Sequence, residues 1–513
     1  MRRYICLHGH FYQPPRDNPW RPGYIEPQPS AAPFRDWNER ILAKCYAPNA
    51  AARVLAADGR IKTIVNNFAR ISFNVGPTLL DWLEASAPET YAAILAADRE
   101  SCARFNGHGG AMAQAYNHTI LPLASDADKR TQIRWGLDDF QRRYQRDAEG
   151  MWLPECAVDL PTLEALCDEG VRFTVLSPLS LAAVRRIGTG AWQKEGLATS
   201  RAYSVPLSRG RSMAVFFYDG EIAQAVAFRR LLDDGASFVR ALEEAPADDG
   251  GLVHIATDGE SYGHHHRFGE MALAFALEAI DARDDLSLTT YGEYLATHPP
   301  EWEAQIVEPS SWSCAHGVER WRSDCGCRGG RYEGATQAWR GPLRVALDEL
   351  RTALDPMAKD DPEVARFLQL MFTSCGWFFD EPSDLETAQI LAYAARALEL
   401  AEARGVPLAV RERFLVKLTE APSFLPEWRD ARRVFEVTEA EQSFAARLAA
   451  FERAPESLVE LRRLLRAAEN VRSSFDLRAA QDLYARLRGR PPRADGEWTA
   501  GFSALGAALG FAA

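Results

Sequence analysis

The first 300 residues alternate between short apolar runs and longer amphipathic segments. Strand-like runs lie at 4–7, 62–66, 172–176, 213–218, 252–256 and 286–289. Helix-like segments lie at 37–46, at 160–169, at 268–282 and after Ser125, where Ile133, Leu137, Phe140 and Tyr144 recur at helical spacing. Alternating strands and helices predict a parallel sheet covered by helices. At this length we favour a closed or nearly closed barrel over a doubly wound sheet.

The pattern changes near residue 337. Segments at 342–354, 385–404 and 457–471 are rich in Ala, Leu, Arg and Glu with helical periodicity, and strand signals nearly vanish. We therefore predict an α/β barrel over 1–300, an irregular connector rich in Cys and Trp over 301–336, and an all-α domain over 337–513. Residues 489–496 are expected to form a loop before a weak final helix.

The composition narrows the possible functions. With 513 residues, 47% hydrophobic and 25% charged, the chain is an ordinary globular protein. A net charge of -12 argues against nucleic acid as a partner, because binding phosphates requires clustered Lys and Arg. We find no signal peptide and no run long enough to span a bilayer, so no membrane partner is expected. Nine cysteines fit reduced thiols and a cytoplasmic location, and the oligomeric state is left open.

The densest group of reactive side chains follows the predicted strand at 252–256. Asp258 and Glu260 come first, and three histidines follow at 264–266. Barrel enzymes carry their catalytic groups at the carboxyl ends of the strands, which is where this turn is expected. These side chains are therefore candidate acids, bases or ligands.

Two earlier turns carry similar chemistry. His8 and His10 end the first predicted strand, and side chains two residues apart on a strand point the same way. They are suited to binding one metal ion or one substrate group. Glu155 follows Trp152-Leu-Pro. It is either a nucleophile beside an aromatic platform for a sugar ring, or an acid favoured at the start of a helix.

A glycine-rich stretch at 106–122 supplies Gln114, Asn117 and His118. These polar side chains suit a polyhydroxylated ligand, although a structural loop explains the stretch equally well.

The connector contains Cys314-Ala-His316 and Cys325-Gly-Cys327. Together these offer four soft or borderline ligands, the number that a structural zinc site needs. The spacing is not that of a common zinc finger. Free thiols are the alternative, and His316 would equally suit the edge of a sugar-binding cleft.

In order and content, these motifs resemble glycoside hydrolase family 57, the retaining α-glucan enzymes with an incomplete (β/α)7 barrel. The resemblance rests on 8–14, 107–118, 152–155 and 258–263 and covers roughly residues 1–320. It extends to a subgroup in which an uncharacterised helical module follows the barrel, marked here by 312–316, 319–327 and 373–380. At 264–266 many family members carry Trp or another bulky residue, so the three histidines imply a more polar leaving-group side.

The resemblance implies that Glu155 is the catalytic nucleophile and Asp258 the general acid/base. It implies that His8, His10, His118 and Glu260 contact or support the substrate, and we predict further contacts from Gln13, Trp152, His264 and His316. The expected substrate is an oligo- or polysaccharide such as maltodextrin or glycogen, and no cofactor is expected. Hydrolysis, transfer and branching remain open.

The residue types suit this chemistry. Retention requires two carboxyl groups about 5–5.5 Å apart, one attacking and one protonating the leaving oxygen. We predict that the negative charge of Glu155 and burial raise the pKa of Asp258. In one alternative, a metal-dependent deacetylase or α-mannosidase-like hydrolase, His8, His10 and Asp258 would hold a divalent cation. The other alternative is a catalytically silent glycan-binding protein.

Overall fold

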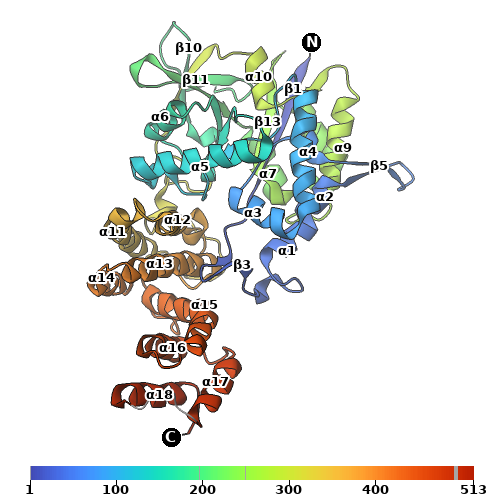
Figure 1. Cartoon of the computed structure of the whole chain (residues 1–513). Helices are drawn as coiled ribbons and strands as arrows, with labels where there is room; N and C mark the ends of the chain where they lie inside the picture. Colours follow the sequence, from blue (N-terminus) through green and yellow to red (C-terminus); the bar gives the residue numbers. More distant parts are fainter. Residues whose placement is uncertain (1, 196, 249, 490–494, 513) are drawn as a thin grey trace. The chain divides into compact units, whose positions relative to one another are not determined.

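The computed structural model describes residues 2–195, 197–248, 250–489 and 495–512, which form two compact units (Figure 1). The first unit comprises Met1–Pro15 and Pro27–Glu319, and the second Arg16–Glu26 and Arg320–Ala513. Most of the loop expected at 489–496 lies outside the described residues.

Within the described residues, parallel strands form a (β/α) barrel in the first unit. In chain order these strands are β1 (Arg3–Phe11), β6 (Ser72–Val75), β7 (Ala113–Gln114), β8 (Met151–Trp152), β9 (Phe173–Leu176), β12 (Ser212–Phe217) and β13 (Leu252–Asp258). Parallel ladders join β13 to β1, β1 to β6, β7 to β8 and β9 to β12. Parallel bridges from Phe73 to Ala111 and from Gly150 to Phe173 complete the series. This is the predicted incomplete (β/α)7 barrel.

Helices cover the outside of this barrel (Figure 1). They are α3 (Pro77–Ser86), α4 (Pro88–Arg104), α5 (Asp126–Tyr144), α6 (Leu160–Asp168), α7 (Gly220–Phe228), α8 (Gly235–Glu244), α9 (Gly269–Asp281) and α10 (Tyr291–Thr297). Ser125 caps α5 through its side chain, which accepts a hydrogen bond from Asp128 N at 3.2 Å. The face of α5 that carries Ile133, Phe140 and Tyr144 is buried, as its periodicity predicts.

One predicted strand lies outside the barrel. The run at 62–66 falls in β5 (Ile61–Val65), which forms an antiparallel hairpin with β4 (Ala52–Leu55) and exposes Ile61 and Ile64. The barrel strand in this region is β6. Its pattern was not distinctive because two of its four buried positions, Ser72 and Asn74, are polar. Those side chains bond to His8 instead of packing against apolar neighbours.

Three further strands enlarge the sheet at its β12 side. They are β10 (Leu181–Arg186), β11 (Ala202–Pro206) and β15 (Trp302–Ile306), in the order β10-β15-β11-β12-β9. A short strand, β14 (Leu286–Leu288), pairs with the start of β1. Because β15 and a bridge from Val158 to Ser310 belong to the first unit, that unit continues past the predicted boundary at residue 300.

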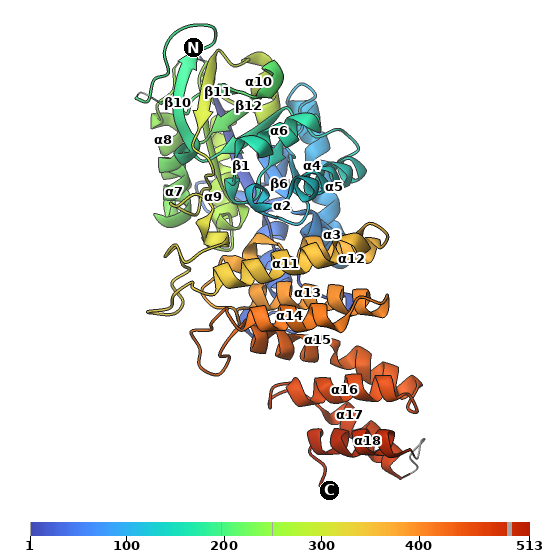
Figure 2. The ribbon, with the colours of Figure 1, turned by 90° about the vertical axis from the view of Figure 1, so that its left-hand side faces the viewer.

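The second unit is helical, as predicted. Its helices are α11 (Arg340–Ala358), α12 (Pro362–Leu370), α13 (Leu385–Ala403), α14 (Leu408–Leu418), α15 (Ala431–Arg453), α16 (Leu458–Asn470), α17 (Arg478–Arg488) and α18 (Gly496–Ala508). Figure 2 shows α13, α15, α16 and α18 stacked in successive layers. Among the described residues, no helix combines the length and the apolar character needed to cross a membrane.

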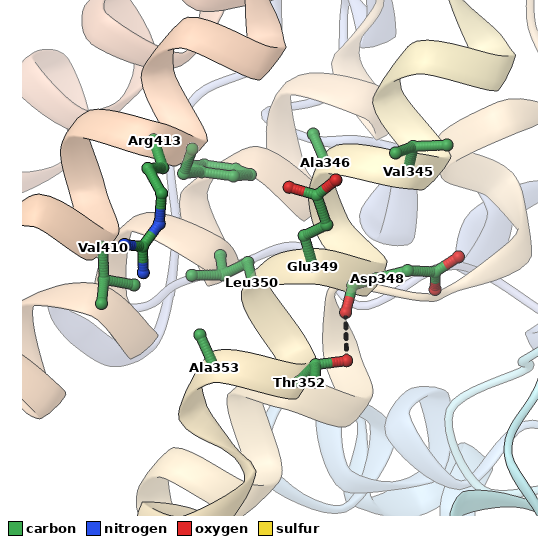
Figure 3. A pocket seen from close by; sticks show the side chains of 10 residues that line it. Val345, Ala346, Asp348, Glu349, Leu350, Thr352, Ala353, Val410 and Arg413 are labelled. Atoms are coloured by element: carbon green, nitrogen blue, oxygen red, sulfur yellow. Dashed lines mark hydrogen bonds between the residues drawn. The ribbon is translucent and has the colours of Figure 1, made fainter.

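A pocket of about 460 Å³ lies between α11 and α14 (Figure 3). Leu350 and Phe414 give it an apolar lining, and Glu349 and Arg413 add charges of both signs.

Residues 16–26 belong to the helical unit, although their place in the sequence predicts the barrel. They form a small hairpin of β2 (Asp17–Asn18) and β3 (Arg21–Ile25). Trp20 Nε1 donates to Glu399 Oε2 at 2.9 Å, and Asn18 Nδ2 donates to the Gln442 carbonyl at 2.8 Å. The partners of these polar groups lie more than 370 residues away, so local periodicity does not reveal them.

Candidate active site

The predicted site residues meet at the carboxyl ends of the barrel strands. In the β1–β13 ladder His10 is opposite Asp258, and in the β1–β6 ladder His10 is opposite Asn74. Glu155 follows β8 directly. The fold therefore brings together side chains that are up to 250 positions apart in sequence.

Glu155 is held by the connector. Its Oε2 accepts hydrogen bonds from Trp312 Nε1 at 3.0 Å and Ser313 Oγ at 2.5 Å, and its carbonyl accepts one from Trp312 N at 2.9 Å. The backbone of Glu155 is left-handed, with φ 59° and ψ 19°. Such a conformation costs on the order of 1 kcal/mol in a non-glycine residue and persists only where the surroundings impose it. Both the backbone and the carboxylate of Glu155 are therefore fixed.

Asp258 has the properties of a proton donor. Desolvation by the surrounding protein, followed by the negative charge of Glu155, raises the pKa of Asp258 to about 7. The direction of the shift agrees with the expectation from the sequence. The side chain is nevertheless exposed and not buried, so a solute can reach it.

Glu260 is buried behind Asp258. Its Oε1 accepts hydrogen bonds from the Tyr46 hydroxyl at 2.6 Å and from Tyr12 N at 3.0 Å. Burial and the charge of Asp258 raise the pKa of Glu260 to about 8. At neutral pH this carboxyl is therefore mainly protonated, and it anchors the chain that leaves β1 without adding a full charge beside Asp258.

Three buried histidines form a hydrogen-bonded row. His8 Nε2 lies 3.0 Å from Asn74 Oδ1, and His10 Nε2 lies 3.1 Å from His118 Nε2. Burial lowers the pKa of His8 and of His10 to about 3, and lowers that of His118 as well. The row is therefore neutral at neutral pH.

Trp152 does not offer the open platform for a sugar ring that its position predicts. The indole is fully buried. It stacks on His8 at 4.7 Å and on His10 at 5.0 Å between ring centroids, and meets the edge of Trp312 at 5.3 Å. Because both neighbours on β1 cover the ring, Trp152 supports the histidines from within the barrel.

The other predicted contacts lie in different surroundings. Gln13 is half-buried and its Nε2 donates to the Tyr12 carbonyl at 3.0 Å. His264 is half-buried with its ring 6.0 Å from that of Trp37, and burial lowers the pKa of His264 to about 4. His316 is exposed and lies beside three cysteines of the connector. Substrate contacts by these three residues remain predictions.

Sequence reasoning missed Asn74, Tyr46, and the bonds of Trp312 and Ser313 to Glu155. Asn74 lies in the undetected strand β6, where alternation of apolar and polar residues from Ile71 to Val75 was the available signal. Tyr46 and Ser313 gave no signal, because each bonds to a carboxylate more than 150 residues away.

In the metal-dependent alternative, His8, His10 and Asp258 would hold a divalent cation. In the part of the chain that the structure describes, these three side chains do not belong to a converging group of metal ligands. The nitrogens of both histidines face Ser72, Asn74 and His118. Among the described residues, the group of three or more potential ligands that converge closely is formed by Cys314, His316, Cys325 and Cys327. The ring nitrogens of His8 and His10 therefore take part in a hydrogen-bonded network.

The sequence profile of glycosyl hydrolase family 57 matches residues 105–306, which include both Glu155 and Asp258. Over these residues the barrel matches glycosyl hydrolase family 57. In the helical unit, residues 362–464 match a domain of unknown function (DUF3536).

Several proteins are similar to this chain. The 4-alpha-glucanotransferase of Thermococcus litoralis is 24% identical over 266 residues, which cover 49% of this chain and 37% of the relative. The chain thus spans little more than a third of that curated relative. The crystal structure of 4-alpha-glucanotransferase from the same organism has a TM-score of 0.57 at 16% identity, covering 78% of this chain and 60% of the other.

Two further solved structures have a similar fold. A GH57 branching enzyme from Thermococcus kodakaraensis has a TM-score of 0.53 at 15% identity, covering 81% of this chain and 94% of the other. An exo-type maltose-forming amylase from Pyrococcus sp. ST04 also has a TM-score of 0.53 at 15% identity, covering 98% and 83%. At these identities the structures establish the shared fold.

Proposed function

We propose that this family 57 protein is a retaining hydrolase or transglycosylase of α-glucans that works through a glycosyl-enzyme intermediate. The observation that carries the proposal is the coupling of Glu155 and Asp258. Glu155 lies just after β8 and Asp258 ends β13, and desolvation, followed by the charge of Glu155, raises the pKa of Asp258 to about 7. Pairs of carboxyl groups tuned apart in this way serve as nucleophile and acid in retaining glycosidases.

In the first step, the Glu155 carboxylate attacks the anomeric carbon and the glycosidic bond breaks. Protonated Asp258 donates its proton to the departing oxygen, so the leaving sugar departs as a neutral alcohol. The bonds from Trp312 and Ser313 keep the attacking carboxylate in one orientation. A nucleophile held in this way loses little entropy on reaching the transition state.

In the second step, ionised Asp258 takes a proton from an acceptor hydroxyl, whose oxygen attacks the anomeric carbon. The ester to Glu155 breaks, and two successive inversions restore the original configuration. Water as the acceptor gives hydrolysis, and a second glucan gives transfer or branching.

Maltodextrin or glycogen is the proposed substrate. The names of two similar proteins support this class, because one is a 4-alpha-glucanotransferase and the other a maltose-forming amylase. A cytoplasmic location is part of the proposal. The free cysteines support it, because thiols persist in a reducing compartment.

Incubation with maltodextrins and glycogen tests the proposal. We expect products of altered chain length or branching from the wild type, with the α configuration retained when fresh products are examined by NMR. Binding of glycogen without any product would favour the silent glycan-binding alternative. Release of acetate from acetylated oligosaccharides, abolished by chelation, would favour the deacetylase.

The connector residues that hold Glu155 are expected to matter for turnover. Trp312→Phe and Ser313→Ala each remove one hydrogen bond to a carboxylate, worth about 1.5–3 kcal/mol. We expect kcat for maltodextrin to fall about 10- to 100-fold in each variant. Ser310→Ala is the matched control, because Ser310 Oγ in the same segment donates to Ser180 and not to Glu155. Equal kcat values in all three variants would show that these bonds do not position the nucleophile.

A further inference from the structure

The connector gathers four side chains that the proposed glycosidase chemistry does not use. Cys314, His316, Cys325 and Cys327 each offer one ligand atom, and these atoms all lie within 4.8 Å of one another. The four residues belong to one short stretch of chain, in two pairs of ligand, spacer and ligand. All three cysteines are in the reduced form.

The arrangement has the dimensions of a tetrahedral metal site. Zinc binds thiolates at about 2.3 Å and imidazole at about 2.0–2.1 Å, which places the ligand atoms of a tetrahedron roughly 3.4–3.8 Å apart. Atoms that already lie within 4.8 Å of one another need only small side-chain movements to reach this spacing. The ligand types fit as well, because thiolates favour borderline and soft cations over magnesium or calcium.

The backbone of each pair is shaped for convergence. Gly317, which follows His316, and Gly326, which separates Cys325 from Cys327, have φ of 83° and 80°. This left-handed conformation is readily available to glycine and disfavoured for other residues. Gly317 N donates to the Cys314 carbonyl at 3.2 Å and its carbonyl accepts from Ser311 Oγ at 2.6 Å. The first ligand pair is therefore folded back on itself by main-chain hydrogen bonds.

We propose that Cys314, His316, Cys325 and Cys327 bind one structural Zn²⁺ ion. Three thiolates and one imidazole fill all four positions of the tetrahedron, so no position is left for a catalytic water. Cys314 is buried, Cys325 and Cys327 are half-buried, and His316 is exposed. The metal is thus reached from the side of the imidazole.

The site has a consequence for the barrel. Trp312 and Ser313, which bond to Glu155, directly precede the first zinc ligand. A metal bound at Cys314 stiffens the segment that carries both donors. This consequence rests on the proposed function, whereas the zinc site itself does not.

Metal analysis of the full chain tests the proposal. We expect one equivalent of zinc in protein produced in zinc-containing medium, and its loss from the double variant Cys325→Ser/Cys327→Ser. Cys102→Ser/Cys167→Ser is the matched control, because it removes two thiols of similar half-buried exposure outside the group and should keep its zinc.

Two measurements on the wild type decide the question if the double variant does not fold. Replacement of zinc by Co²⁺ should give the intense visible absorption of a tetrahedral thiolate site, and a strong chelator should lower the melting temperature by several degrees. Wild-type protein that neither contains zinc nor takes up Co²⁺, or a disulfide among these cysteines in the freshly isolated protein, would overturn the proposal. Zinc content is independent of glucan turnover, so the failure of one proposal is distinguishable from the failure of the other.

Discussion

Replacement of Glu155 by Gln is expected to lower kcat/KM for maltodextrin about 10⁴- to 10⁶-fold, the range seen when a hydrolase loses its nucleophile or a residue that acts with it. The amide keeps the shape of the side chain and still accepts bonds from Trp312 and Ser313. It carries no negative charge with which to attack the anomeric carbon. Steady-state assays of reducing ends and of transfer products measure the effect.

Two comparisons separate this chemical role from a loss of structure. Glu169→Gln removes the same charge from a residue that pairs with Arg130 and Arg134, and should leave turnover unchanged. In Glu155→Gly, added azide should occupy the vacated position and release a glycosyl azide of inverted configuration. Turnover by Glu155→Gln within tenfold of the wild type would contradict the assignment of the nucleophile.

Replacement of Asp258 by Asn is expected to lower turnover of maltodextrin about 10²- to 10⁴-fold, the usual contribution of general acid–base catalysis. The loss should depend on the leaving group. A glycosyl fluoride departs without a proton, so formation of the intermediate from it should be slowed far less than from maltodextrin. A loss of the same size for both substrates would show that Asp258 is not the proton donor.

The pH profile gives a second test of Asp258. The pKa of about 7 means that the proton is present below pH 7 and is lost as the pH rises through that value. In the wild type, kcat/KM for maltodextrin should therefore fall above about pH 7, because this parameter reports the ionisation of the free enzyme. The alkaline limb should vanish in Asp258→Asn and persist in Asp285→Asn, which alters an exposed carboxylate paired with Arg283.

The periodicity of the sequence was sufficient for many elements of the fold. Helices such as α5 and α16 show a buried face at helical spacing, and β9 and β13 are short apolar runs. The information in such segments is local, because the burial of one face fixes the spacing of its apolar residues. Strand β6 was missed for the same reason, since two of its buried side chains are polar.

Prediction from the local sequence pattern also failed where the position of a side chain depends on residues far away in the sequence. The sequence predicts that Trp152 is an aromatic platform beside Glu155. In the structure its ring is instead enclosed between residues of β1 and the connector. Residues 16–26 continue the His8 motif in sequence and yet pack in the helical unit. Neither outcome follows from neighbouring residues.

The sequence by itself determined the barrel, the helical region, and the identity of Glu155 and Asp258 as candidate partners. The barrel and the helical region follow from hydrophobic spacing. The pairing of Glu155 with Asp258 is what the resemblance to family 57 implies. Only the tertiary structure decided that Trp312 and Ser313 hold Glu155 and that Tyr46 holds Glu260. The sequence predicted the direction of the shift in the pKa of Asp258, and the structure gave its size, to about 7. Hydrogen bonds and desolvation depend on which atoms lie close together in space. That proximity arises only when folding brings distant strands of the chain side by side.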